Sequence, residues 1–194
     1  MNRSAQVVTI PAESPAGIAD WIRNTGLVLA ASGLVALSAH VAVPLPFTPV
    51  PVTLQPFAVL LLGLLLSPRL AFATMAAYLT EGAMGLPVFT PHGLGGVAQI
   101  LGPTGGYLLS YPLVAPMVSA WWRRGDRAFP RTLLVTGAGS LVTLALGAVW
   151  FGFLTHAGAA AVLNGAVLPF LPGDALKVCL AAGIAVRVSR RRAI

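Results

Sequence analysis

Charged residues are scarce in this sequence of 194 residues: only 9% are Asp, Glu, Lys or Arg, whereas 57% are hydrophobic. A soluble domain carries roughly a quarter charged residues, because it must face water on all sides. The shortage of charge therefore argues against a soluble globular domain. It predicts one membrane-embedded domain, since the chain is short enough to form a single core.

Acidic residues, cysteines and catalytic motifs are also scarce or missing. Five acidic residues stand against twelve Lys and Arg, which gives a net charge of +7. The arginines fall in short clusters between apolar segments and form no stripe with aromatics, so we expect no binding to nucleic acid. Cys179 is the single cysteine and the three histidines match no metal motif, so we expect no disulfide and no metal. The chain carries no GxxxxGK[ST] loop for ATP and no nucleophile–base constellation, so we do not expect an enzyme.

Long apolar segments are what the sequence does contain. A membrane-spanning helix needs about twenty mostly apolar residues. Six segments approach or reach this length, at residues 22–43, 54–66, 69–85, 102–122, 132–154 and 173–188. We therefore predict an all-α integral membrane protein with six transmembrane helices in a domain at 21–190. A polar tail at 1–20 precedes it and a basic tail at 191–194 follows.

The basic residues predict the orientation of this bundle. Eleven of the twelve lie in the two terminal segments or in the even-numbered loops, and the odd-numbered loops contain none. Cytoplasmic loops are enriched in Lys and Arg, so we expect both termini in the cytoplasm. The first twenty residues lack the apolar run of a signal peptide, which also favours a cytoplasmic tail.

The odd-numbered, outward loops have an unusual composition. They read PLPFTPVPVT, LPVFTPHGLGG and LPFLPG, rich in proline and glycine and poor in charge. Such residues pre-set backbone angles and do not extend helices, so they favour shaped, fairly rigid loops. Irregular backbone near a membrane persists where protein or a wet cavity satisfies its polar groups. The outer face is therefore the expected mouth of a pocket.

Three charged side chains lie inside the apolar segments: Glu81, Asp174 and Lys177. Ionisable residues within a membrane are costly and usually face the bundle interior or a water-filled cavity. Asp174 and Lys177 are three residues apart, so they share a helix face. Two simpler roles stay open: Asp174 can cap its helix while Lys177 pairs with it, and Glu81 can be hydrated at the outer end of its helix.

Further polar residues are expected at the same outer level. Thr53 and Gln55 follow the first outward loop, and the motif GPTGGY at 102–107 opens the fourth segment. Its Gly105 and Gly106 permit close approach by a ligand, although a glycine-rich turn by itself is more typical of packing against a neighbouring helix. Tyr107 can line an apolar wall, although aromatics near helix ends also anchor to the membrane interface. These residues predict a pocket for a small, partly apolar ligand that donates and accepts hydrogen bonds.

Four ordered motifs resemble one known family. They are PLPFTPVPVTLQ at 44–55, EGAMGLPVF at 81–89, GPTGGYLLSYPL at 102–113 and LPGDALK at 171–177. In sequence and spacing they resemble the biotin-binding BioY family. The resemblance implies a six-helix substrate-binding (S) component of an energy-coupling-factor (ECF) transporter in the cytoplasmic membrane. Its partners would be biotin, a coupling membrane protein and two ATP-binding-cassette ATPases, with no cofactor and with ATP used only by the ATPases.

The resemblance also suggests roles for the polar residues. Asp174 would accept the ureido N–H groups of biotin, while Lys177, Gln55 or Thr53 completes the polar shell. Glu81 is a further candidate, and Tyr107 with Gly105 and Gly106 would lie near the bicyclic ring. The ligand carboxylate could meet Lys177, helix amides near Thr104, or water. A different vitamin specificity on the same bundle is the main alternative, and a channel or an intramembrane enzyme is less well supported by the residues.

The first segment contains small residues at fourfold spacing, Gly26 with Ala30 and Ser32 with Ala36. Small residues let helices approach each other closely. In the related family an alanine-rich surface on this helix contacts the coupling protein, so Ala30, Ser32 and Ala36 are candidates for that contact. The same residues could instead pack the bundle.

Overall fold

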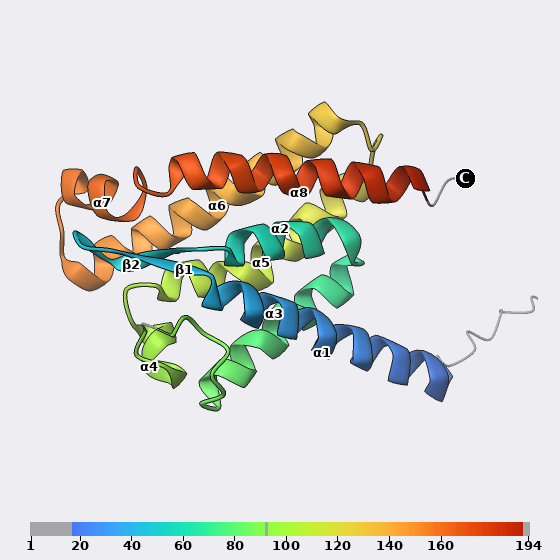
Figure 1. The fold of residues 1–194 in the computed structure, drawn as a ribbon, viewed down its shortest axis with the longest axis horizontal. Helices are drawn as coiled ribbons and strands as arrows, with labels where there is room; N and C mark the ends of the chain where they lie inside the picture. The colour runs from blue at the N-terminus through green and yellow to red at the C-terminus, as the bar shows by residue number, and fades with distance from the viewer. Residues whose placement is uncertain (1–16, 92, 192–194) are drawn as a thin grey trace, which may run out of the picture.

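The computed structural model describes residues 17–91 and 93–191. Most of the predicted N-terminal tail and all but the first residue of the basic tail lie outside these ranges. Within them the fold is mainly helical (Figure 1). The six longest helices occupy the six predicted segments; they are α1 (Ile18–His40), α2 (Gln55–Leu65), α3 (Pro68–Ala83), α5 (Gly105–Arg123), α6 (Phe129–Thr155) and α8 (Leu171–Arg191).

Length and composition identify membrane-type helices in this bundle. Helices α1 and α6 are each long and apolar enough to cross a bilayer. Helix α8 and the short α7 (Ala159–Ala166) meet the same test together, although they are bent by 49°. Helix α2 is apolar but shorter. The described chain therefore contains two or three spans by this criterion alone, and crossing by all six helices remains a prediction.

Local sequence explains where these helices begin and end. Proline occupies the first turn of α2, α3 and α6, where its missing N–H is not needed. Ser67 caps α3, because its hydroxyl accepts a hydrogen bond from the amide of Leu70 at 3.4 Å. His156 ends α6 in the left-handed conformation, with φ of 53°.

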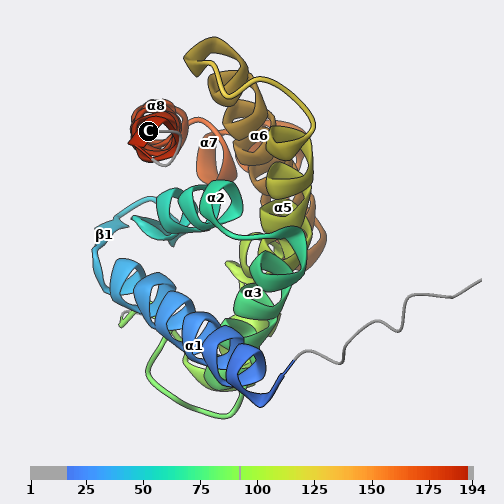
Figure 2. The ribbon, with the colours of Figure 1, turned by 90° about the vertical axis from the view of Figure 1, so that its right-hand side faces the viewer.

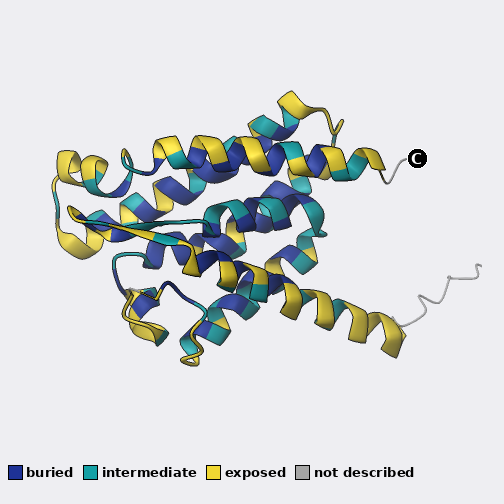
Figure 3. Ribbon diagram, in the orientation of Figure 1, coloured by how far each residue is buried: buried dark blue, intermediate teal, exposed yellow. Residues whose placement is uncertain are grey.

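Helix α5 lies at the centre of the packing. It contacts α2, α3 and α6, while α8 packs on α2 and α6 and α1 packs on α3 and α2 (Figure 2). The largest fully buried side chains include Tyr78, Tyr111 and Leu60. The outer sides of the helices remain exposed (Figure 3), and they carry large apolar residues such as Leu37, Leu134 and Phe153. An apolar outer surface of this extent fits lipid rather than water as the surroundings.

The loops that the sequence predicts to face outward contain more regular structure than expected. The first forms an antiparallel hairpin of β1 (Ala42–Leu45) and β2 (Thr48–Thr53), so the all-α prediction needs this correction. Proline is tolerated there because each strand of a two-stranded hairpin has a free edge that needs no N–H donor. The second and third loops contain the short helices α4 (Gly96–Leu101) and α7, which the sequence analysis also missed.

Candidate binding site

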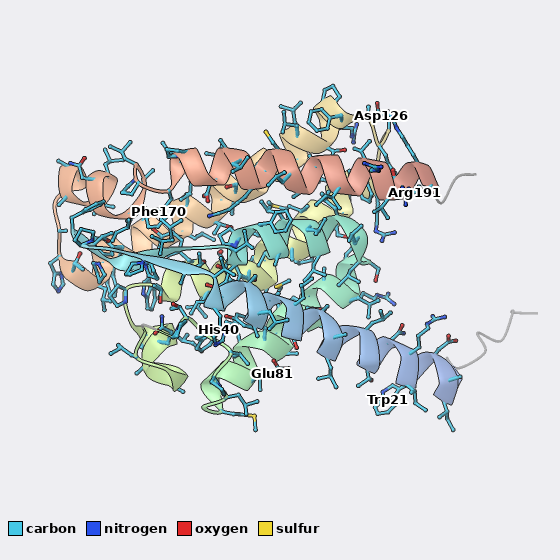
Figure 4. The ribbon with its side chains drawn as sticks, in the orientation of Figure 1. Trp21, His40, Glu81, Asp126, Phe170 and Arg191 are labelled. Atoms are coloured by element: carbon cyan, nitrogen blue, oxygen red, sulfur yellow. The ribbon has the colours of Figure 1, made fainter. Side chains whose placement is uncertain are left out.

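A pocket lies at the loop-bearing end of the bundle, between the hairpin, α4, the adjoining ends of α2, α5 and α8, and the middle of α6. It encloses about 500 Å³ not filled by protein atoms, including its open mouth. Phe170, which lines it, lies at the end of the bundle opposite Asp126 and Arg191 (Figure 4). The complete lining is Val50, Pro51, Thr53, Gln55, Pro56, Gln99, Thr104, Tyr107, Tyr111, Thr143, Leu144, Phe170, Asp174 and Lys177.

The charged pair on α8 lines this pocket. Lys177 Nζ donates to Asp174 Oδ1 at 2.9 Å, and Ser140 Oγ on α6 donates to Asp174 Oδ2 at 3.3 Å. The two charged residues are only 6% and 7% exposed. Among the described residues, the Asp174 carboxylate thus forms an ion pair with Lys177 and accepts a hydrogen bond from Ser140. These contacts favour the pairing role over the helix-capping role. Burial of such a pair is costly, which favours a functional reason for its position.

A second polar group is fixed at the start of α2. Thr53 Oγ1 donates to Gln55 Oε1 at 3.1 Å, and Gln55 Nε2 donates to the hydroxyl of Tyr78 at 2.6 Å. That hydroxyl in turn donates to the carbonyl of Val88 at 3.1 Å. The amide of Gln55 is thus oriented by both neighbours, and it keeps one N–H and one oxygen lone pair for a ligand.

Gln99 on α4 is a pocket residue that the sequence analysis missed. Its Oε1 accepts from the amide of Leu94 at 2.6 Å, and its Nε2 donates to Thr104 Oγ1 at 2.7 Å. The only sequence signal was a glutamine in an otherwise apolar run before the GPTGGY motif. Thr143 was also missed, although Thr136, Ser140 and Thr143 repeat at helical spacing along α6.

Aromatic side chains form the apolar wall. The Tyr107 and Phe170 ring centroids lie 5.9 Å apart, and both rings line the pocket. The Tyr107 hydroxyl donates to the carbonyl of Ala166, which ties α5 to the end of α7. Tyr111, one turn further along α5, is almost fully buried beside it. The pocket therefore places three rings near the charged pair.

The structure assigns Gly105 and Gly106 to packing rather than to the pocket lining. A Cβ on Gly105 would lie 1.8 Å from the carbonyl oxygen of Ile100, and one on Gly106 would lie 2.3 Å from Cβ of Trp150. The two glycines thus let α5 approach α4 and α6 closely. This geometry favours the alternative of helix packing, and neither glycine is among the residues that line the pocket.

Glu81 also lies away from the pocket. It is on α3 at the contact with α1 (Figure 4), where its Oε1 accepts from Ser32 Oγ at 2.8 Å. Ser32 is 1% exposed, so its place on a coupling surface is corrected too: it faces the bundle. Ala36 is half-buried against the core, whereas Ala30 is exposed.

A substitution at Gly147 tests the packing behind Tyr107. A Cβ on Gly147 of α6 would lie 2.2 Å from the Tyr107 ring, so Gly147→Ala should lower thermal stability by about 1–3 kcal/mol through overpacking. The matched control is Gly137→Ala on the same helix, where a Cβ meets no atom within 4 Å. Thermal unfolding in detergent compares them, and equal melting temperatures for the two variants would contradict this packing.

Comparison with known proteins identifies one family that resembles this chain over nearly its whole length. The model of the BioY family matches residues 5–193. The chain is 36% identical over 166 residues to the probable biotin transporter BioY of Pyrococcus horikoshii, covering 86% of this chain and 96% of that protein. It is 35% identical over 159 residues to the biotin transporter BioY of Thermotoga maritima, covering 82% and 91% respectively.

One solved structure is similar throughout the fold. It is the crystal structure of the S-component for biotin from an ECF-type ABC transporter, with a TM-score of 0.80 and 24% sequence identity. The match covers 90% of this chain and 94% of that one. It supports the arrangement of helices described above.

Proposed function

Because this chain belongs to the BioY family, we propose that it binds biotin and serves biotin uptake as the substrate-binding component of an ECF-type transporter. The observation that carries the proposal is the pocket at the loop-bearing end. It joins the buried Asp174–Lys177 pair and the oriented Gln55 amide to a wall of aromatic rings. Few fixed polar groups on an apolar lining are typical of small-molecule sites.

The chemistry of biotin suits this arrangement. Its ureido group offers two N–H donors and one carbonyl acceptor, which a carboxylate and an amide N–H can match. Asp174 accepts the ureido donors, and Gln55, Thr53 or Lys177 completes the polar shell. The Tyr107 ring lies against the bicyclic ring, and Gln99 with Thr104 offers a second polar edge to the ligand.

Equilibrium binding to the purified chain in detergent tests this function. We expect biotin to bind with a Kd below about 1 µM, equivalent to roughly −8 kcal/mol, while thiamine and riboflavin do not compete. Calorimetry or radioligand binding measures this directly. Folded protein that prefers another vitamin would support the transporter class but refute the biotin assignment.

Six membrane crossings with both termini in the cytoplasm are part of the proposal. The arginine-bearing end of the bundle would then face the cytoplasm, and the pocket would open outward. Reporter fusions test the topology: a C-terminal green fluorescent protein should fluoresce, and alkaline phosphatase inserted at Gly158 between α6 and α7 should be active. The reverse activities would overturn the orientation.

Transport would require further subunits. The proposed partners are a coupling membrane protein and two ATP-binding-cassette ATPases, because the sequence contains no GxxxxGK[ST] loop of its own. ATP is then used only by the partners. The chain itself contributes the binding site, in the cytoplasmic membrane, without cofactor or catalysis.

A further inference from the structure

A basic groove lies at the end of the bundle opposite the pocket, between the start of α6 and the last turns of α8. It encloses about 730 Å³ not filled by protein atoms, including its open side. Arg191 and Asp126 lie at this end, far from Phe170 (Figure 4). The lining comprises Phe129, Gly183, Val186, Arg187, Arg190 and Arg191. The groove therefore has an apolar inner part and an arginine rim.

The rim carries positive charge without a protein counter-ion among residues 17–91 and 93–191. None of the ion pairs of this part of the chain includes Arg187, Arg190 or Arg191. The nearby acidic residue of the α5–α6 loop, Asp126, pairs instead with Arg131 at 3.7 Å. Three guanidinium groups beside one groove favour an anionic occupant with several acceptor oxygens.

An apolar path continues from the groove along α8. Leu176, Leu180 and Ile184 are exposed at fourfold spacing on the helix that carries the arginines. An occupant with a charged head and long apolar tails fits this sequence of surfaces better than a wholly polar one, because both of its parts find a matching surface.

We propose that this groove binds an anionic phospholipid, with Arg187, Arg190 and Arg191 around the phosphate and the acyl chains along α8. In the proposed orientation the arginines lie at the cytoplasmic leaflet, where anionic headgroups attract basic clusters next to membrane helices. Gly183 leaves space at the inner end of the groove, because a Cβ there would meet no heavy atom within 4 Å.

Native mass spectrometry of the detergent-solubilised chain tests this site, with phosphatidylglycerol and phosphatidylcholine of the same acyl chains as probes. Phosphatidylglycerol should bind the wild type more tightly than phosphatidylcholine. The double variant Arg187→Gln/Arg190→Gln should lose about twenty- to thirtyfold of this affinity, since each arginine near an anionic surface adds roughly fivefold. Gly183→Trp should also lose it, because the indole fills the groove while every charge stays in place.

The matched control is Arg69→Gln/Arg124→Gln, which removes the same charge from exposed arginines outside the groove. This control should keep the lipid affinity, and all variants should keep biotin binding, which verifies their fold. An equal loss in the control, or full lipid binding by Gly183→Trp, would reduce the effect to general surface charge and overturn the site. The proposal would also fail if the wild type bound both lipids equally and the arginine variant impaired biotin uptake only in the assembled transporter. That result would assign the arginines to a protein partner instead.

Discussion

Asp174→Asn is expected to weaken biotin binding by roughly 30- to 5,000-fold, the equivalent of about 2–5 kcal/mol for breaking a buried charged pair. The carboxylate would lose its strong acceptance of the ureido N–H groups. Lys177 would also be left with an ammonium group that is buried and without its partner at 2.9 Å. Calorimetric titration of the purified variant with biotin measures the loss. Asp126→Asn is the control, because that aspartate is exposed and lies at the other end of the bundle.

A second variant separates the ligand contact from the ion pair. Asp174→Asn alone should lower the melting temperature, whereas Asp174→Asn/Lys177→Met removes both charges and should restore it. If Asp174 contacts biotin, binding stays weak in the double variant although stability returns. Recovery of binding together with stability would reduce Asp174 to the counter-ion of Lys177 and refute its role in recognition.

The helices were predictable because their signals are local. A run of apolar residues that follows Pro68 or Pro130, or that ends at Arg123, identifies a helix and one of its limits without any knowledge of the partners. The hairpin at 42–53 was not predictable in the same way, since its prolines indicate an irregular loop and its stability depends on pairing between strands. Helix α7 was missed because a short stretch in a glycine-rich loop carries too few residues for a clear period.

The candidate site likewise combines residues found from local signals with residues whose roles depend on packing between helices. Asp174 and Lys177 were found because they are charged residues in an apolar segment, and their spacing of three predicted that they share a helix face. Ser140 and Gln99 could not be found, since their positions beside Asp174 and Thr104 depend on how α4, α5, α6 and α8 pack. The glycines of GPTGGY were found, but their role could not be predicted. The motif is typical of a close contact, and only the position of Trp150 identifies that contact as helix packing.

Helix α1 presents a different surface from the one the fourfold spacing first indicated. Ser32 faces α3, while Gly26 and Ala30 are exposed and Gly33 is half-exposed on a strip of α1 between larger apolar residues. A Cβ on Gly26 or Gly33 would meet no atom within 4 Å. Small residues in the apolar outer face of a helix permit close approach by another helix.

Ala30→Trp is therefore expected to abolish ATP-driven biotin uptake by the assembled transporter. The indole would obstruct the strip of small residues that we propose as the contact with the coupling protein. Binding to the isolated chain should stay within about twofold of wild type, because exposed substitutions rarely change stability by more than 0.5 kcal/mol. Uptake of labelled biotin by proteoliposomes and binding in detergent are the two measurements.

Two further variants serve as controls for Ala30→Trp. Leu141→Trp puts the same side chain on the exposed face of α6 and should leave uptake intact, whereas Ala36→Trp enters the half-buried side of α1 and should lower stability and binding together. Loss of uptake in Ala30→Trp and Leu141→Trp alike would show that any bulky group on the membrane face is harmful. If only Ala30→Trp loses uptake and this variant still binds biotin, the result places the coupling contact on α1. The substitution would then impair transport without impairing binding of the vitamin.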